Sequence, residues 1–146
     1  MNGGASAALG ALPVVATVIG DPAGIGPEVC AKALALDRDP RSARHLLIGS
    51  IDAVRLAVAA SGIACQAYPV RSPDDIDDAA GGIAVLDPGN LPREAWSVGQ
   101  AGAASGRAVI EWIEIAEGLA RDGQIQAWIM APVDSSSLKL SGKVES

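Results

Sequence analysis

The sequence predicts an α/β protein in which a mostly parallel sheet carries helices on both faces. Short apolar runs, rich in Val and Ile, alternate with segments of helical spacing, which is the pattern of repeated strand–helix–strand units. The 146 residues suffice for one domain with its own core, and 49 % of them are apolar. Phe is absent, so the core must be built mainly from Ala, Val, Ile and Leu, which suits helices packed closely on a sheet.

The first strand is expected over residues 13–19, a continuous run of apolar and β-branched residues. A helix follows the next loop, with Pro27 in its first turn, where a missing N–H costs nothing, and it ends before Pro40. The apolar residues that share one face of this helix, and that we expect to point inward, are Ile25, Val29, Ala33 and Leu36.

Four further strands and one helix are expected in the middle of the chain and near its end. The strand at 45–50 leads into a helix that Ser50 or Asp52 can cap and that Gly62 ends. Residues 62–70 alternate in polarity and contain Pro69, so this strand should lie near a sheet edge. The last two strands are expected at 82–90 and 125–133.

The longest helical pattern spans residues 97–123, with Ser97 as its cap and Gly123 at its end. Its first half consists of small residues, among them three glycines. Because glycine costs roughly 1 kcal/mol per helical position relative to alanine, this composition indicates that another backbone lies close by. Its apolar face is formed by Ala108, Trp112, Ile115, Ala116 and Leu119.

Charge and cysteine content exclude several classes of function. The net charge is −6 and no cluster of Lys and Arg is present, so nucleic acid is not an expected partner. Asp75, Asp77 and Asp78 lie in a polar loop, which favours solvated surface over a metal site. No apolar run reaches the ~20 residues that cross a bilayer, and the start lacks the basic region of a signal peptide. Cys30 and Cys65 lie in apolar patterns and are expected to be buried thiols of a cytoplasmic protein.

Residues 20–28, with the sequence GDPAGIGPE, are the main candidate for ligand binding. They follow a strand, and ligands of open parallel sheets bind beyond the carboxyl ends of the strands. Glycines allow a ligand to approach the backbone closely, and the helix start offers N–H groups to an anion. The spacing matches neither the dinucleotide fingerprint nor the P-loop. On composition alone, a plain strand-to-helix corner is an equally good interpretation.

Three segments of the chain resemble one known family. GDPAGIGPE is similar to the amino-terminal signature of the 4-hydroxythreonine-4-phosphate dehydrogenases of pyridoxine and pyridoxal phosphate biosynthesis. It also resembles a shorter loop in isocitrate and isopropylmalate dehydrogenases, which share that fold. Residues 99–116 resemble the family's helix that begins Gly-Gln and is rich in small residues, and residues 125–142 resemble its later strand, turn and helix. The resemblance runs from residue 14 to residue 142 in the same order and spacing.

This resemblance implies an incomplete isocitrate/isopropylmalate dehydrogenase-like fold and the amino-terminal half of a homodimeric cytoplasmic enzyme. Family members use NAD or NADP to oxidise 4-hydroxythreonine 4-phosphate, or a related hydroxy acid, to a keto acid that loses CO2. In the family a divalent metal, held by histidines, polarises the reacting oxygens. His45 is the single histidine here and lies outside the matched motifs, so the metal ligands are expected outside this chain, which alone should be inactive.

The resemblance assigns cofactor or substrate binding to the first motif, while no catalytic residue can be named. The binding-loop candidates are Gly20, Asp21, Gly24, Gly26 and Glu28. Asp21 could orient a ribose or a water, or it could cap the turn, and the sequence leaves both open. Glu28 could take part in binding, but we favour a structural role on the positive end of the helix dipole.

The third motif departs from the family pattern. Asp134 and Ser135 stand where the family has His or Asn followed by Lys, and this loss of a cation indicates a paralogue with a different substrate. Lys139 could replace the missing charge, although we favour a solvated helix residue. The substrate-side candidates are therefore Asp134, Ser135 and Lys139.

The expected organisation is a flexible tail at 1–12, an α/β domain at 13–133 and the start of a second domain at 134–146. An unpaired sheet edge in such a chain should be covered by a partner chain or by its own tail. The alternative to a dehydrogenase is a truncated or degenerate relative that acts as a non-catalytic binding or interaction module. The small-molecule substrate and the homodimer belong to the first hypothesis, and neither hypothesis includes a membrane.

Overall fold

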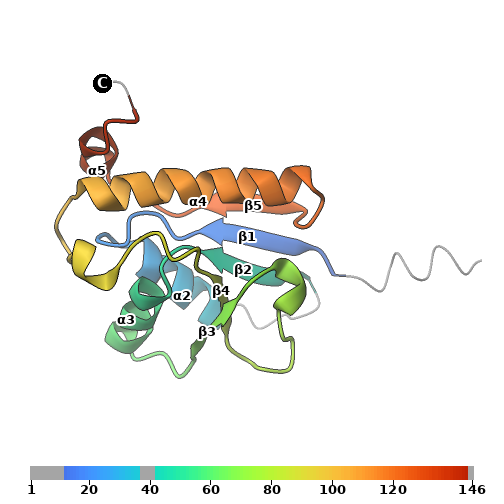
Figure 1. Cartoon of the computed structure of the whole chain (residues 1–146). Helices are drawn as coiled ribbons and strands as arrows, with labels where there is room; N and C mark the ends of the chain where they lie inside the picture. Colours follow the sequence, from blue (N-terminus) through green and yellow to red (C-terminus); the bar gives the residue numbers. More distant parts are fainter. Residues whose placement is uncertain (1–11, 37–41, 145–146) are drawn as a thin grey trace, which may run out of the picture.

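The computed structural model describes residues 12–36 and 42–144, and it contains a five-stranded parallel sheet of order β3-β4-β2-β1-β5 (Figure 1). The predicted α/β class is therefore confirmed. The predicted tail at 1–12 lies outside the described residues except for Leu12. The strands are β1 (Val14–Val18), β2 (Arg44–Ile48), β3 (Ala67–Val70), β4 (Ile83–Leu86) and β5 (Ala127–Met130). The helices are α2 (Gly26–Leu36), α3 (Ile51–Ser61), α4 (Ala103–Arg121) and α5 (Ser135–Leu140), with short 3-10 turns η1 (Pro73–Asp75) and η2 (Arg93–Ala95).

The helices cover both faces of the sheet. Figure 1 shows α4 on one face and α2 and α3 on the other. Since every strand pair is parallel, the carboxyl ends of all five strands lie at one edge. The core is built from small and branched apolar side chains, as predicted, together with the fully buried Trp112. The indole Nε1 of Trp112 donates to Oδ1 of Asn90 at 2.9 Å, so this buried polar atom is satisfied.

Helix α2 faces inward with a different side from the one predicted. Its buried residues are Gly26, Pro27, Cys30 and Ala31, whereas Ile25, Val29 and Leu36 of the predicted inward face are exposed. The cause is the close approach of the helix to the sheet. A Cβ on Gly26 would lie 2.1 Å from the carbonyl oxygen of Ile19, so only small residues fit on that side and the bulky ones point outward.

Helix α4 begins at Ala103, so the prediction of Ser97 as its cap is wrong. Gly99 has φ +81°, a left-handed conformation that ends regular helix geometry, and residues 97–102 therefore form a loop. Gly102 is the actual N-cap. The prediction of a close backbone is confirmed, because a Cβ on Gly106 would lie 2.0 Å from the carbonyl oxygen of Ser137 in α5.

Most other local predictions are confirmed. Ser50 caps α3, and its Oγ accepts from the amide of Ala53 at 3.3 Å, while Gly62 ends that helix at φ +65°. Strand β3 is an edge strand and contains Pro69. The thiol of Cys65 is only half-buried, so the prediction of two buried thiols holds for Cys30 alone.

The opposite edge of the sheet is formed by β5, on which Ile129 and Met130 are exposed. Helix α5 packs against α4. The predicted covering of the β5 edge, by a partner chain or by the chain's own tail, stays a prediction. No helix within 12–36 or 42–144 combines the length and apolar character that crossing a bilayer requires.

Candidate ligand site at the carboxyl edge of the sheet

The three segments that carry the family resemblance meet at the carboxyl edge of the sheet. The amide of Asp21 donates to the carbonyl of Pro132 at 3.2 Å, which joins the loop after β1 to the loop after β5. The amide of Gly99 donates to the carbonyl of Ala23 at 2.7 Å, which joins the same loop to the segment before α4. Segments more than 100 residues apart therefore form one continuous surface, at the edge where parallel sheets bind ligands.

Two of the three loop glycines are required by packing of the backbone on itself. Gly20 has φ +74°, and a Cβ there would lie 2.2 Å from the carbonyl oxygen of Pro132. A Cβ on Gly26 would likewise lie 2.1 Å from the carbonyl oxygen of Ile19. Gly24 differs, since it is exposed and a Cβ would meet only atoms of Asp21, at 3.6 Å. Of the loop glycines, Gly24 is thus the one whose backbone is open to a ligand.

Asp21 braces this loop from within. It is 1 % exposed, its Oδ1 accepts from the amide of Ala23 at 2.8 Å, and its carbonyl accepts from the amide of Gly24 at 3.0 Å. Its other carboxylate oxygen, Oδ2, is buried and has no partner among the described residues. This geometry matches the capping interpretation of Asp21, because the carboxylate is turned into the corner rather than outward.

The start of α2 is poorly equipped to bind an anion, contrary to what the glycine-rich loop suggests. Pro27 has no N–H to offer, and the carboxylate of Glu28 already lies in the first turn. Glu28 is half-buried and forms an ion pair with Lys32 one turn later. Its position at the positive end of the helix dipole agrees with the structural role that the sequence favours.

The substrate-side candidates lie on the short helix α5. Asp134 is its N-cap, and Oδ1 accepts from the amide of Ser136 at 2.7 Å. Ser135 and Lys139 are exposed. Asp134 thus has a local structural role in the place where the family pattern has His or Asn, and the exposure of Lys139 fits the solvated interpretation.

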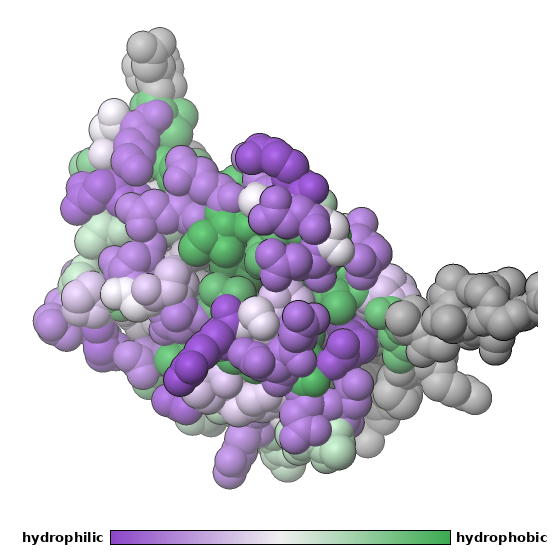
Figure 2. All heavy atoms as spheres, turned by 45° about the vertical axis from the view of Figure 1, so that its right-hand side comes forward, coloured by the Kyte–Doolittle hydropathy of each residue, from purple (hydrophilic) through white to green (hydrophobic). Residues whose placement is uncertain are grey.

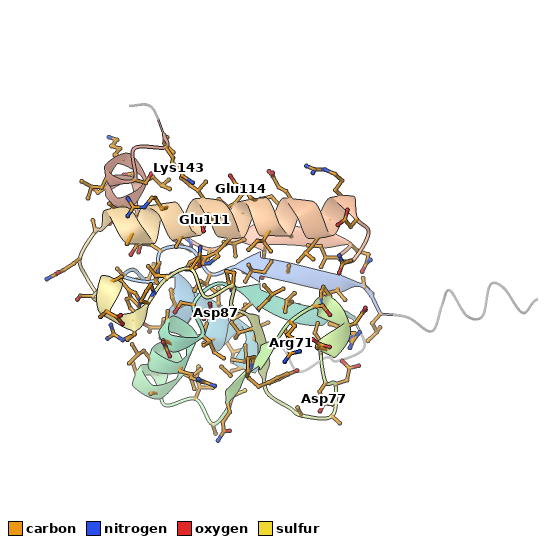
Figure 3. All side chains as sticks on the ribbon, in the orientation of Figure 1. Arg71, Asp77, Asp87, Glu111, Glu114 and Lys143 are labelled. Atoms are coloured by element: carbon orange, nitrogen blue, oxygen red, sulfur yellow. The ribbon has the colours of Figure 1, made fainter. Side chains whose placement is uncertain are left out.

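The helices that begin at this edge differ in how their first amides are satisfied. At the start of α3, the amide of Ile51 donates to Oδ2 of Asp87 at 2.8 Å, in addition to the Ser50 cap; Figure 3 shows Asp87 beside this helix. At the start of α4, Gly102 provides no side-chain cap, and the first turn contains no acidic residue. Ser105 in that turn is fully buried, and its Oγ has no partner among the described residues.

Sequence reasoning did not single out Ser105 or Ser137. The amide of Gly102 donates to Oγ of Ser137 at 3.2 Å, so α5 contributes a hydroxyl to the start of α4. Both serines are 0 % exposed. Both are polar residues at buried helical positions, which could have marked them as candidates. Because serine is small, Ser105 was counted instead as part of the small-residue pattern.

The metal expected from the resemblance does not fit the residues at hand. Within the described part of the chain, no group of three or more His, Cys, Asp or Glu side chains is placed to hold a metal ion. His45 lies near the beginning of β2, at the amino edge of the sheet and away from the three motifs. Burial raises the pKa of the Cys30 thiol to about 11, so this thiol is protonated at neutral pH.

A cavity of about 630 Å³ lies at that opposite, amino edge, where its lining includes Leu34, Arg44, His45 and Tyr68. Figure 2 turns the amino side of the molecule toward the viewer and shows hydrophobic residues gathered between hydrophilic ones. Arg44 is already engaged, since its Nε lies 2.9 Å from Oδ1 of Asp78 and it also donates to the carbonyl of Ile76. The loop of Asp78 is otherwise acidic and exposed, as predicted.

Comparison with known proteins agrees with the resemblance. No family model matches the chain. A protein of Novosphingobium aromaticivorans with the provisional name 4-hydroxythreonine-4-phosphate dehydrogenase is 39 % identical over 133 residues, which cover 91 % of this chain and 40 % of that protein. The D-threonate 4-phosphate dehydrogenase of Cupriavidus necator is 34 % identical and covers 90 % of this chain and 39 % of its own length.

Solved structures give the same result. A 4-hydroxythreonine-4-phosphate dehydrogenase from Burkholderia phymatum superposes with a TM-score of 0.83 at 30 % identity, covering 90 % of this chain and 40 % of that one. A terephthalate 1,2-cis-dihydrodiol dehydrogenase from Burkholderia xenovorans superposes with a TM-score of 0.71 at 31 % identity, with coverages of 90 % and 38 %. The chain is therefore a homologue of the 4-hydroxythreonine-4-phosphate dehydrogenases, and it spans about 40 % of the length of the curated relatives it matches.

Proposed function

We propose that this chain is the amino-terminal part of a metal- and NAD(P)-dependent dehydrogenase that oxidises 4-hydroxythreonine 4-phosphate or a related hydroxy acid, with decarboxylation of the keto acid product. The observation that supports this most is the meeting of three family-like segments at one edge of the sheet through the hydrogen bonds of Asp21 and Gly99. The dehydrogenase names of the relatives support the reaction class.

Within that function, this chain would supply a rigid wall of the active site. Gly24 presents open backbone, while Gly20 and Gly26 lock the loop against its neighbours. NAD or NADP, when bound, would accept the hydride. The metal ligands, and the second subunit of the homodimer, are proposed to come from outside the described residues, because these hold no group suited to a metal.

A second candidate is a non-catalytic binding or interaction module. It is favoured by one observation: Asp134 caps α5, so the segment that resembles the family's lysine-bearing turn carries a carboxylate and the neutral, exposed Ser135. A relative with these residues could keep the fold and lose the activity.

A chimaera distinguishes the two functions. The chain is joined to the part of the Novosphingobium aromaticivorans relative that lies beyond its 133 matched residues. Formation of reduced nicotinamide is then followed with NAD or NADP, a divalent metal, and phosphorylated and non-phosphorylated hydroxy acids. The dehydrogenase proposal expects turnover by the chimaera and none by the chain alone. A folded chimaera without turnover on any of these substrates, where the intact relative is active, contradicts it and supports the module.

A further inference from the structure

The start of α4 leaves several hydrogen-bond donors without an acceptor. The main-chain N–H groups of Ala103, Ala104 and Ser105 have no acceptor in the described part of the chain, and the first intrahelical bond is made by Gly106 to the carbonyl of Gly102. Ala103 and Ala104 are half-buried, so their side of the turn is reachable from solvent. With 19 residues, α4 is the longest helix of the described structure, and its dipole adds positive potential at this end.

Two buried hydroxyls add to these amides. Ser105 is fully buried, and its Oγ has no hydrogen-bond partner among the described residues. The Oγ of Ser105 is directed to the N-cap, because it is the nearest atom, at 3.9 Å, to a Cβ built on Gly102. Leaving a buried hydroxyl unpaired is unfavourable, and a bound acceptor would offset this cost. Ser137 Oγ accepts from the amide of Gly102 and keeps its own proton free for donation.

The two hydroxyls are held by close packing of α5 on α4. Gly106 lets the carbonyl of Ser137 approach so closely that a Cβ would be 2.0 Å away. The contact therefore fixes Ser137 beside the first turn of α4. The same turn carries no carboxylate, in contrast to the first turn of α2 with Glu28.

We propose that the start of α4 is an oxyanion site, in which the amides of residues 103–105 and the hydroxyls of Ser105 and Ser137 bind a phosphoryl or carboxylate group of a small hydroxy acid. Helix starts bind such groups through free amides and the helix dipole. The identity of the carrier as a hydroxy acid rests on the proposed function, whereas the binding of the anion does not. Binding is therefore measured without cofactor or turnover.

The test is a titration of the 15N-labelled 146-residue chain, followed through its backbone amide resonances, with inorganic phosphate and, separately, with D-threonate as a non-phosphorylated hydroxy acid. We expect saturable shifts at residues 103–105. Binding of phosphate alone identifies a phosphoryl subsite, and binding of D-threonate alone identifies a carboxylate subsite. Absence of saturable shifts with both ligands, or shifts confined to Gly26 and Glu28, overturns the proposal.

Substitution of Gly102 gives a variant that blocks the site without damaging the fold. Gly102 has extended φ and ψ, and a Cβ there meets only the Oγ of Ser105, at an ordinary contact distance of 3.9 Å, so Gly102→Asp should fold and place its own carboxylate on the free amides. We expect its affinity for the anion to fall at least about tenfold, while Gly102→Ala, which adds no acceptor, retains binding. Unchanged affinity in folded Gly102→Asp contradicts the proposal.

The hydroxyls are tested by Ser105→Ala and Ser137→Ala, each expected to weaken binding about tenfold because a charge-assisted hydrogen bond is lost. Ser97→Ala is the matched control, since this serine is exposed in the preceding loop, and it should bind as the parent chain does. If both buried-serine variants bind like Ser97→Ala, the hydroxyls have no part in the site and the proposal fails as stated. Anion binding in a chain whose chimaera shows no turnover would support the oxyanion site and contradict only the proposed dehydrogenase.

Discussion

Helices α2 and α4 both begin at the carboxyl edge of the sheet, but they begin in opposite ways. The start of α2 follows a glycine- and proline-rich loop that resembles a ligand motif, yet its glycines at 20 and 26 serve backbone packing and its first turn holds Glu28. The start of α4 has an unremarkable sequence of small residues, yet among the described residues the amides of 103–105 and the Oγ of Ser105 have no partner, and Ser137 Oγ accepts only from the amide of Gly102. A glycine-rich motif can therefore mark a tightly closed corner, while the donors for a ligand lie in the segment beside it.

The largest expected effect concerns the closed corner at α2. Gly26→Ala places a Cβ 2.1 Å from the carbonyl oxygen of Ile19, so the helix must move from the sheet, and we expect a loss of about 3 kcal/mol in the free energy of unfolding. Gly24→Ala is the matched control, because its Cβ would make only ordinary contacts with Asp21 at 3.6 Å, and the expected change is within about 0.5 kcal/mol. Urea denaturation measures both. Equal destabilisation by the two variants would show that the corner is not closed as described.

The next effect concerns the contact that brings α5 to the start of α4. Gly106→Ala should detach α5, because the new Cβ would lie 2.0 Å from the carbonyl oxygen of Ser137, and hydrogen exchange of residues 135–140 should become faster. Gly118→Ala lies in the same helix with open space around its Cβ and should stabilise the protein by about 0.5–1 kcal/mol. Protection of α5 that is the same in both variants would contradict a close α4–α5 contact.

A smaller effect on stability distinguishes a serine that caps a helix from one that does not. Ser50→Ala removes the hydroxyl that accepts from the amide of Ala53, and should cost about 1 kcal/mol. Ser97→Ala should change stability by less than about 0.5 kcal/mol, since this residue is six positions before the helix that the sequence assigned to it. Thermal denaturation compares the two. A loss for Ser97→Ala as large as that for Ser50→Ala would restore the predicted cap.

The smallest effect at neutral pH concerns Cys30 on the closed side of α2. Burial raises its pKa to about 11, so the unfolded chain loses this proton first and stability should fall as the pH rises from 9 toward 11. Below pH 9 the thiol is protonated in both states and has no such effect. Urea denaturation of the parent and of Cys30→Ala between pH 9 and 11 measures this loss of stability, and the fall should be smaller in the variant.

Thiol reagents at pH 8 should modify the half-buried Cys65 and spare Cys30. Fast modification of Cys30 in the folded chain would contradict its burial.

The fold was predictable because its signals are local and repeated. Strand and helix alternation gave the parallel sheet, Pro69 placed β3 at an edge, and Ser50 and Gly62 marked the ends of α3. The inward face of α2 was predicted wrongly because the spacing of apolar residues carries no information about the distance between helix and sheet. The two approach so closely at Gly26 that only small residues fit between them. The N-cap of α4 was misplaced by five residues, at Ser97 instead of Gly102, because the left-handed φ of Gly99 has no signature in an otherwise helical composition.

The candidate site was predictable only in its location. The order of the motifs indicated that they follow β1 and β5, and parallel pairing brings those ends together. The hydrogen bonds from Asp21 to Pro132 and from Gly99 to Ala23 depend on tertiary packing, which spacing does not encode. The same holds for Ser105 and Ser137, whose proximity arises from two helices that touch at Gly106.

The most direct test of the contrast between the two helix starts is a crystal structure of the chain grown in the presence of phosphate. We predict a tetrahedral ion at the start of α4, within hydrogen-bond distance of the amides of residues 103–105. A well-defined ion at the start of α2, bound to the amides of Gly26 and Glu28 with the start of α4 empty, would contradict the account.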